Sequence, residues 1–94
     1  MRVSFGRRLV VHGRVQGVFY RGWAVETARS LGLDGWVRNR RDGSVEMAIG
    51  GNETAMDEMI ARCRQGPPAA RVTGIEIAQT DMEVPAGFEG RPTV

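Results

Sequence analysis

The chain has 94 residues, which suits one domain around one core, and 41% of them are hydrophobic while 26% are charged. All thirteen basic residues are arginine, so chemistry at a lysine is excluded, and one cysteine with one histidine excludes an internal disulfide and a four-ligand zinc site. The net charge of +2 permits an anionic partner without identifying one.

No apolar run approaches the roughly 18 residues that cross a bilayer. The first residues, MRVSFGRRLVV, lack the longer apolar segment and cleavage site of a secretory signal. We therefore expect a cytoplasmic protein with no membrane contact. A monomer is the default expectation. A single domain over residues 1–94 is predicted, with a core at about 7–80 and a tail or edge strand at 81–94.

A strand and then a helix are predicted first. Residues 7–13, RRLVVHG, are β-branched and apolar at their centre and are bounded by glycines, which is typical of a buried strand. From Tyr20 the apolar residues recur with a helical period, and the helix should end at Gly32. The apolar stripe of this helix consists of Tyr20, Ala24, Ala28 and Leu31.

A hairpin should follow. Residues 35–39, GWVRN, and 44–50, SVEMAIG, alternate as strands do. Between them Asp42-Gly43 is a strong turn signal. We expect the apolar side chains of the second segment to face the helices.

A second helix and a strand complete the pattern. Asn52 can cap a helix whose apolar residues recur at three- and four-residue intervals as far as Cys63, and Gly66-Pro67-Pro68 should stop it. Residues 70–80, ARVTGIEIAQT, then read as a strand. Phe88 can start a short extra strand, which Gly90 and Pro92 should confine to a sheet edge.

The order strand, helix, strand, strand, helix, strand has few solutions. Right-handed crossovers place both helices on one face of a mostly antiparallel sheet of four or five strands. The sequence therefore predicts an α+β fold of the ferredoxin-like, split βαβ kind (βαββαβ).

The connection between the first strand and the first helix has no usual capping residue. A helix N-terminus presents unpaired N–H groups and about half a positive charge, and between Gly13 and Tyr20 there is no Ser, Thr, Asp or Asn to meet them. Gly13 and Gly17 can turn successive N–H groups inward, and Arg21 adds a planar guanidinium that suits two phosphate oxygens. Two interpretations remain open: a phosphate site, or a connection solvated by water.

Asn39 is the second candidate. An asparagine before a hairpin is usually a turn former. In a split βαβ fold, however, its strand ends near the end of the first strand, where its amide can hold a water in line for attack.

Three segments together resemble the acylphosphatase family. They are GRVQGVFYR at residues 13–21, GLDGWVRNRRDGSVE at 32–46 and GPPAARV at 66–72, in that family's order and spacing. The resemblance covers about residues 7–80. It implies the ferredoxin-like fold and hydrolysis of small acyl phosphates to a carboxylate and inorganic phosphate, without metal or organic cofactor.

The resemblance also implies site residues. Arg21 and Asn39 correspond to the family's essential arginine and water-orienting asparagine. The phosphate-binding segment corresponds to Val15, Gln16, Gly17, Val18, Phe19, Tyr20 and Arg21, acting mainly through backbone N–H groups. Tyr20 stands where the family usually has phenylalanine, a change that should preserve packing.

Two other functions are compatible with this topology. An RNA-binding module shares this topology, and RNRR is basic, but such modules stack bases on aromatic residues of the central strands, and RLVVHG and SVEMAIG contain none, so we expect no nucleic-acid partner. A non-catalytic anion-binding domain, like the acylphosphatase-like part of carbamoyl-transferring maturation proteins, belongs to a much longer chain.

The remaining notable residues have ordinary interpretations. We expect His12 to be a packing or surface residue and Cys63 a small core residue. Trp23 and Trp36 either pack together or line the acyl side of the substrate. Either anion steering or a solvated turn explains the arginines at 38, 40 and 41.

Overall fold

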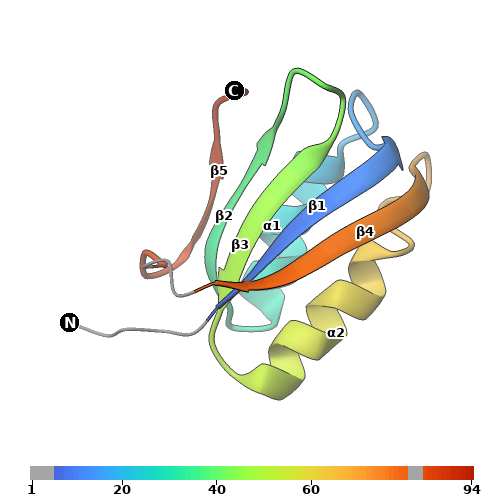
Figure 1. The fold of residues 1–94 in the computed structure, drawn as a ribbon. Coiled ribbons are helices and arrows are strands. Elements are labelled where there is room, and N and C mark those ends of the chain that lie inside the picture. Colours follow the sequence, from blue (N-terminus) through green and yellow to red (C-terminus); the bar gives the residue numbers. More distant parts are fainter. Residues whose placement is uncertain (1–5, 81–83) are drawn as a thin grey trace.

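The computed structural model describes residues 6–80 and 84–94, and five strands and two helices lie within them (Figure 1). Residues 1–5 and 81–83, which belong to the predicted domain and its tail, lie outside the described residues. In chain order the elements are β1 (Gly6–Arg14), α1 (Tyr20–Ser30), β2 (Asp34–Asn39), β3 (Val45–Gly50), α2 (Glu53–Cys63), β4 (Arg71–Thr80) and β5 (Phe88–Arg91).

The strands form one sheet in the order β4-β1-β3-β2-β5, and both helices cover the same face (Figure 1). Neighbouring strands are antiparallel except β2 and β5, which are parallel. The predicted ferredoxin-like α+β fold is confirmed, with the mostly antiparallel sheet at its upper predicted size. No helix in the described ranges is long and apolar enough to cross a bilayer.

The core lies between the helices and the sheet. Alternate residues of β1 and β3 point into it, so that Leu9 and Val11 meet Val45, Met47 and Ile49. The helices contribute the stripes that their periodicity predicted, and all these helix residues are buried: Tyr20, Ala24, Ala28, Met56, Met59, Ile60 and Cys63.

The opposite face of the sheet carries a charged cluster around Glu46, which is only 5% exposed. Its carboxylate accepts hydrogen bonds from Arg8 Nε at 2.7 Å and Arg38 Nε at 2.9 Å. Burial alone would raise the pKa of Glu46, but these two hydrogen bonds and the two positive charges outweigh it and hold the pKa below its usual value. The cluster therefore favours the ionised carboxylate.

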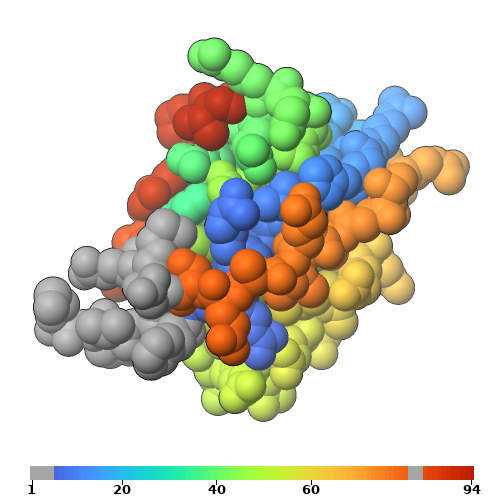
Figure 2. All heavy atoms as spheres, in the orientation of Figure 1, coloured from blue at the N-terminus to red at the C-terminus, as the bar shows by residue number. Residues whose placement is uncertain are grey.

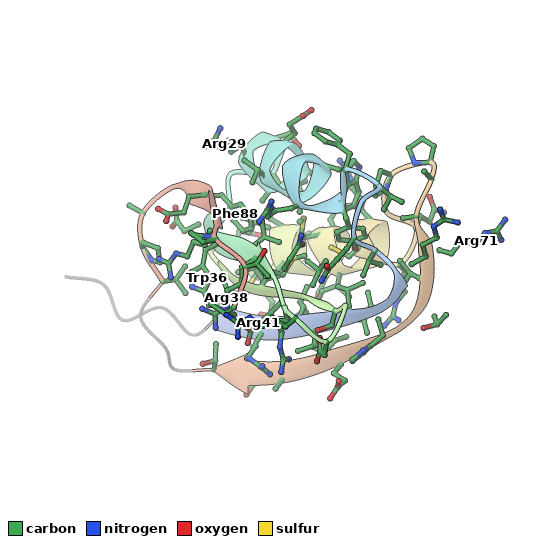
Figure 3. All side chains as sticks on the ribbon, turned by 90° about the horizontal axis from the view of Figure 1, so that it is seen from above. Arg29, Trp36, Arg38, Arg41, Arg71 and Phe88 are labelled. Carbon is green, nitrogen blue, oxygen red and sulfur yellow. The ribbon has the colours of Figure 1, made fainter. Side chains whose placement is uncertain are left out.

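Trp36 lies on this same face, away from the helices (Figure 3). It is buried, and the guanidinium groups of Arg38 and Arg91 lie 4.6 and 5.1 Å from its ring centroid. Its ring is therefore not free to stack on a base, as the RNA-binding alternative would need.

The last strand, β5, forms at the sheet edge despite Gly90 and Pro92. Its ladder with β2 ends at Arg91, one residue before the proline that has no N–H to give. Backbone pairing then resumes, because Val94 donates to the carbonyl of Asn39 at 3.1 Å and accepts from Arg41 at 2.8 Å. The chain end and the β2–β3 hairpin are accordingly neighbours on the surface (Figure 2).

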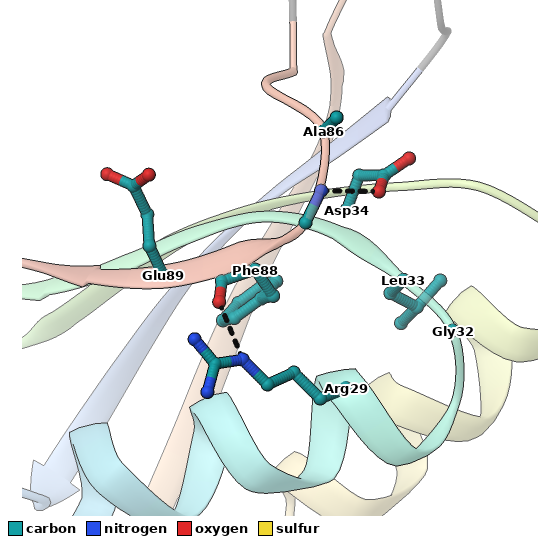
Figure 4. Close-up of a pocket in the computed structure, with 8 residues that line it drawn as sticks. Arg29, Gly32, Leu33, Asp34, Ala86, Phe88 and Glu89 are labelled. Atoms are coloured by element: carbon teal, nitrogen blue, oxygen red, sulfur yellow. Dashed lines mark hydrogen bonds between the residues drawn. The ribbon is translucent and has the colours of Figure 1, made fainter.

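The start of β5 is hydrogen-bonded to the end of α1 and to the start of β2. Arg29 Nε of α1 donates to the carbonyl of Phe88 at 3.0 Å, and Asp34 Oδ1 of β2 accepts from the N–H of Gly87 at 2.8 Å (Figure 4). The Phe88 side chain is buried in the core. The residues that make these two contacts line an open pocket of about 430 Å³.

Candidate active site

The segment between β1 and α1 has an unusual backbone. The pairing of β1 with β4 shifts between His12 and Gly13, and Gly13 has φ 120°. A Cβ atom there would lie 2.1 Å from the carbonyl oxygen of Arg71, so only glycine fits. Gly17 (φ 73°) and Phe19 (φ 65°) are also left-handed. For a bulky residue such as Phe19 this conformation costs on the order of 1–3 kcal/mol, which suggests a functional role.

Helix α1 begins without a side-chain cap. Phe19 occupies the N-cap position, and the first turn has no acidic residue. Within the described residues, no backbone or side-chain acceptor meets the N–H groups from Val18 to Arg21. The positive end of the helix dipole and its free donors are therefore available to an anion.

A pocket of about 400 Å³ lies at this helix end. Its walls come from most of the predicted loop residues and from both predicted catalytic side chains. They are Val15, Gln16, Gly17, Phe19, Tyr20, Arg21, Gly22 and Asn39. Val18 is the predicted loop residue that does not line it, because its side chain packs on the core.

Arg21 lies in the first turn of α1 and is held by the last strand. Its Nη1 donates to the carbonyl oxygen of Arg91 at 3.2 Å. One bond to a neutral carbonyl leaves the other guanidinium donors free and fixes the direction of the side chain.

Asn39 ends β2 and lines the same pocket, so a second element contributes to it. Its amide oxygen Oδ1 is completely buried, yet no group in residues 6–80 or 84–94 donates to it. A buried acceptor without a donor is costly, on the order of 1–3 kcal/mol. A molecule that supplies a hydrogen in the pocket removes that cost.

The acylphosphatase family model matches residues 7–90, which is most of the chain. The chain belongs to the acylphosphatase family. It is 56% identical over 94% of its length to an acylphosphatase of Rhizorhabdus wittichii, of which it covers 89%, and 58% identical over 81% of its length to one of Rhodopseudomonas palustris, of which it covers 79%. Among solved structures, the acylphosphatase of Bacillus subtilis superposes with a TM-score of 0.88 at 34% identity, covering 93% of this chain and 98% of that one.

Gln16 has a role in this acylphosphatase that the sequence did not reveal. Its side-chain amide donates to the carbonyl of Arg40 at 2.7 Å and to that of Ser44 at 2.9 Å. The phosphate-loop prediction counted Gln16 only for its backbone. Its side chain also joins the loop to the hairpin that follows Asn39, so the loop and the end of β2, which both line the pocket, are connected.

Tyr20 is also more than a substitute for phenylalanine. Its buried hydroxyl donates to the carbonyl of Cys63 at 2.7 Å. The N–H that would normally meet this carbonyl is that of residue 67, which is proline and has none. Burial raises the pKa of Tyr20, and it raises that of the Cys63 thiol to about 11, so both groups stay neutral.

The two tryptophans are not at the pocket. Trp23 packs against Tyr20 with ring centroids 5.2 Å apart, and Trp36 lies on the far face of the sheet. The sequence left open whether they pack together or line the acyl side; they do not pack together, because the sheet separates them, and neither is among the described pocket residues.

Among the described residues, no acidic residue or histidine lines the pocket. Asp42, in the nearby hairpin, is occupied by the hydroxyl and N–H of Ser44, at 2.6 and 2.9 Å, and these bonds lower the pKa of its carboxyl group. No cluster of three or more His, Cys, Asp or Glu side chains able to hold a metal occurs in residues 6–80 and 84–94. The charge available at the pocket is thus positive, from α1 and Arg21.

Proposed function

We propose that this acylphosphatase hydrolyses the carboxyl–phosphate bond of small acyl phosphates with the groups that surround the 400 Å³ pocket. The phosphoryl oxygens would accept from the loop N–H groups of residues 15–20 and from Arg21. These donors are fixed before substrate arrives, which is the condition for strong stabilisation of transition-state charge. The observation that carries the proposal is that the uncapped end of α1 and the unpartnered Asn39 Oδ1 belong to one pocket.

Asn39 positions the nucleophile in this proposal. Its Oδ1 accepts a hydrogen from a water and thereby turns an oxygen lone pair toward phosphorus, opposite the leaving carboxylate. A carboxylate leaves without a proton, so no general acid is needed. The water's proton passes to the phosphoryl group itself, which fits a pocket whose described lining residues include no carboxylate or imidazole.

The test compares Arg21→Ala and Asn39→Ala with Arg64→Ala, a surface arginine beyond α2. Loss of one preorganised electrostatic contact costs on the order of 10² to 10³ in rate. We expect losses of that size in turnover of benzoyl or acetyl phosphate for the first two variants and none for Arg64→Ala. Inhibition by inorganic phosphate should weaken in Arg21→Ala and persist in Asn39→Ala, because Asn39 acts on water. Wild-type turnover by Asn39→Ala would remove its role.

We also propose a monomeric, single-domain enzyme in a reducing compartment such as the cytoplasm. All described strands join one sheet, and the one cysteine is buried and unpaired. Sedimentation equilibrium and cell fractionation test these points; a dimer or an exported protein would contradict them.

A further inference from the structure

Phe19 exposes its aromatic ring at the edge of the pocket. The side chain is 65% exposed, and the other large exposed hydrophobic residues in the described ranges, Ile77 and Val94, do not line the pocket. The other apolar side chains of the pocket wall, Val15 and Tyr20, are buried. Phe19 is therefore the apolar surface that a bound molecule meets on leaving the pocket.

The backbone directs this ring outward. With φ 65° and ψ 21°, Phe19 is left-handed at the N-cap of α1, so its side chain does not join those of Val15 and Tyr20 in the core. A left-handed aromatic residue is uncommon, since glycine or asparagine suits that conformation better. The sequence thus keeps an exposed aromatic ring at a position that favours a smaller residue.

Gly22 makes room for the ring. A Cβ atom on Gly22 would lie 2.3 Å from Cε1 and 2.7 Å from Cζ of Phe19, so the ring lies directly over this glycine. Gly22 is inside α1, where alanine would favour the helix more, and its φ does not require glycine. Its value is the space that it leaves for Phe19.

We propose that Phe19 contacts the acyl group of the substrate and that this ring favours aromatic or extended apolar acyl groups over the acetyl group. This rests on the proposed function, which places the phosphoryl group at the loop N–H groups and Arg21. The acyl carbon chain then points out of the pocket. Trp23 and Trp36 are elsewhere and Tyr20 is buried, so among the described residues Phe19 is the exposed ring that can meet it. Two rings in contact gain more than their buried area alone provides.

The test is a ratio of kcat/KM values, benzoyl phosphate over acetyl phosphate. If Phe19→Ala disturbs the loop itself, it changes kcat/KM for both substrates by the same factor, and this factor cancels in the ratio. We expect the ratio to fall roughly threefold to tenfold in Phe19→Ala. It should also fall in Gly22→Ala, because the added methyl group must displace the ring while Phe19 remains. Ile77→Ala, which removes the exposed apolar side chain on β4, is the matched control and should keep the wild-type ratio.

Binding without turnover separates this inference from the proposed reaction. Phenylphosphonate and methylphosphonate differ only in the group that would meet Phe19. We expect Phe19→Ala to weaken inhibition by phenylphosphonate more than by methylphosphonate. If Phe19→Ala changed neither the ratio of kcat/KM values nor the relative inhibition by the two phosphonates, the proposed contact between Phe19 and the acyl group would be refuted. A wild-type enzyme inactive on both acyl phosphates would instead refute the proposed function.

Discussion

Tyr20 joins the two helices through one hydroxyl group. Its ring fills the core beside Trp23, as a phenylalanine would, but its oxygen meets the Cys63 carbonyl that Pro67 leaves without a helical partner. The hydroxyl of Tyr20, at the start of α1, thus replaces the donor that the proline after α2 cannot supply.

We expect Tyr20→Phe to lower the free energy of unfolding by about 1–2 kcal/mol, because a buried carbonyl loses its donor while the ring volume stays the same. Urea unfolding followed by circular dichroism measures this. Ser30→Ala is the control, since the Ser30 hydroxyl donates to the Thr27 carbonyl at an exposed position; its effect should stay within about 0.5 kcal/mol. Equal stability of Tyr20→Phe and wild type would show that water replaces the hydroxyl.

Among the elements, β5 is the one that connects the chain end to the pocket. Phe88 anchors it in the core, Arg29 holds its first carbonyl, and Arg91 offers its own carbonyl to Arg21. Phe88 is seen pointing toward the helices in Figure 3. An edge strand of four residues therefore helps to direct the guanidinium at the pocket.

Phe88→Ala should lower the free energy of unfolding by about 3–5 kcal/mol, as loss of a buried phenyl ring usually does. It should also raise KM for the acyl phosphate, since a loosened β5 no longer fixes Arg21. Gly90→Ala is the matched change in the same strand: an added Cβ would meet Val25 and Arg21 at 3.7 and 3.9 Å, which is ordinary contact, so near wild-type behaviour is expected. Equal KM values in the wild type, Phe88→Ala and Gly90→Ala would show that β5 does not affect substrate binding in the pocket.

The elements were predictable where one local pattern decides them. Helix α2 was predicted with its cap, because Asn52 and the Gly-Pro-Pro stop are local signals. The uncapped start of α1 was predictable from the absence of a capping residue before Tyr20, and the places of Arg21 and Asn39 followed from the predicted helix and strand. The side-chain bonds of Gln16 and Tyr20 were not, since their acceptors are backbone carbonyls 24 and 43 residues away whose identity no pattern records. The exposure of Phe19 likewise depends on a left-handed φ that propensity disfavours.

At the scale of the whole molecule, the sheet has one apolar face and one face with an ionic centre. Glu46 is buried on the second face, where its carboxylate forms ion pairs with Arg8 and Arg38 from the strands on either side. Its lowered pKa means that the folded chain stabilises the ionised form of Glu46 more than the unfolded chain does. The sheet therefore gains stability that depends on pH.

The sign follows from linkage. The contribution of Glu46 is fully present above the unfolded glutamate pKa of about 4.3 and is lost as the pH falls toward the lower pKa of the folded chain. We expect Glu46→Gln to cost on the order of 1–3 kcal/mol at pH 7, and the difference from wild type should narrow as the pH falls below about 4.3. Urea unfolding over a pH series measures it.

Glu58→Gln is the comparison for that experiment. Glu58 pairs with Arg62 one turn further along α2, and both side chains are exposed. Such pairs contribute about 0.3–0.5 kcal/mol. A Glu46→Gln deficit that stayed constant from neutral to acid pH would mean that packing, not charge, accounts for it.

The hydrogen bond from Arg21 to Arg91 spans 70 positions of the chain. On the ribosome the loop is made early, and its arginine emerges long before the carbonyl that directs it. We expect a nascent chain arrested before residue 88 to have the loop in place but little hydrolytic activity, and activity to begin only when β5 has been released. Synthesis from the N-terminus toward the C-terminus thus delays the enzyme's chemistry until β5 has been made.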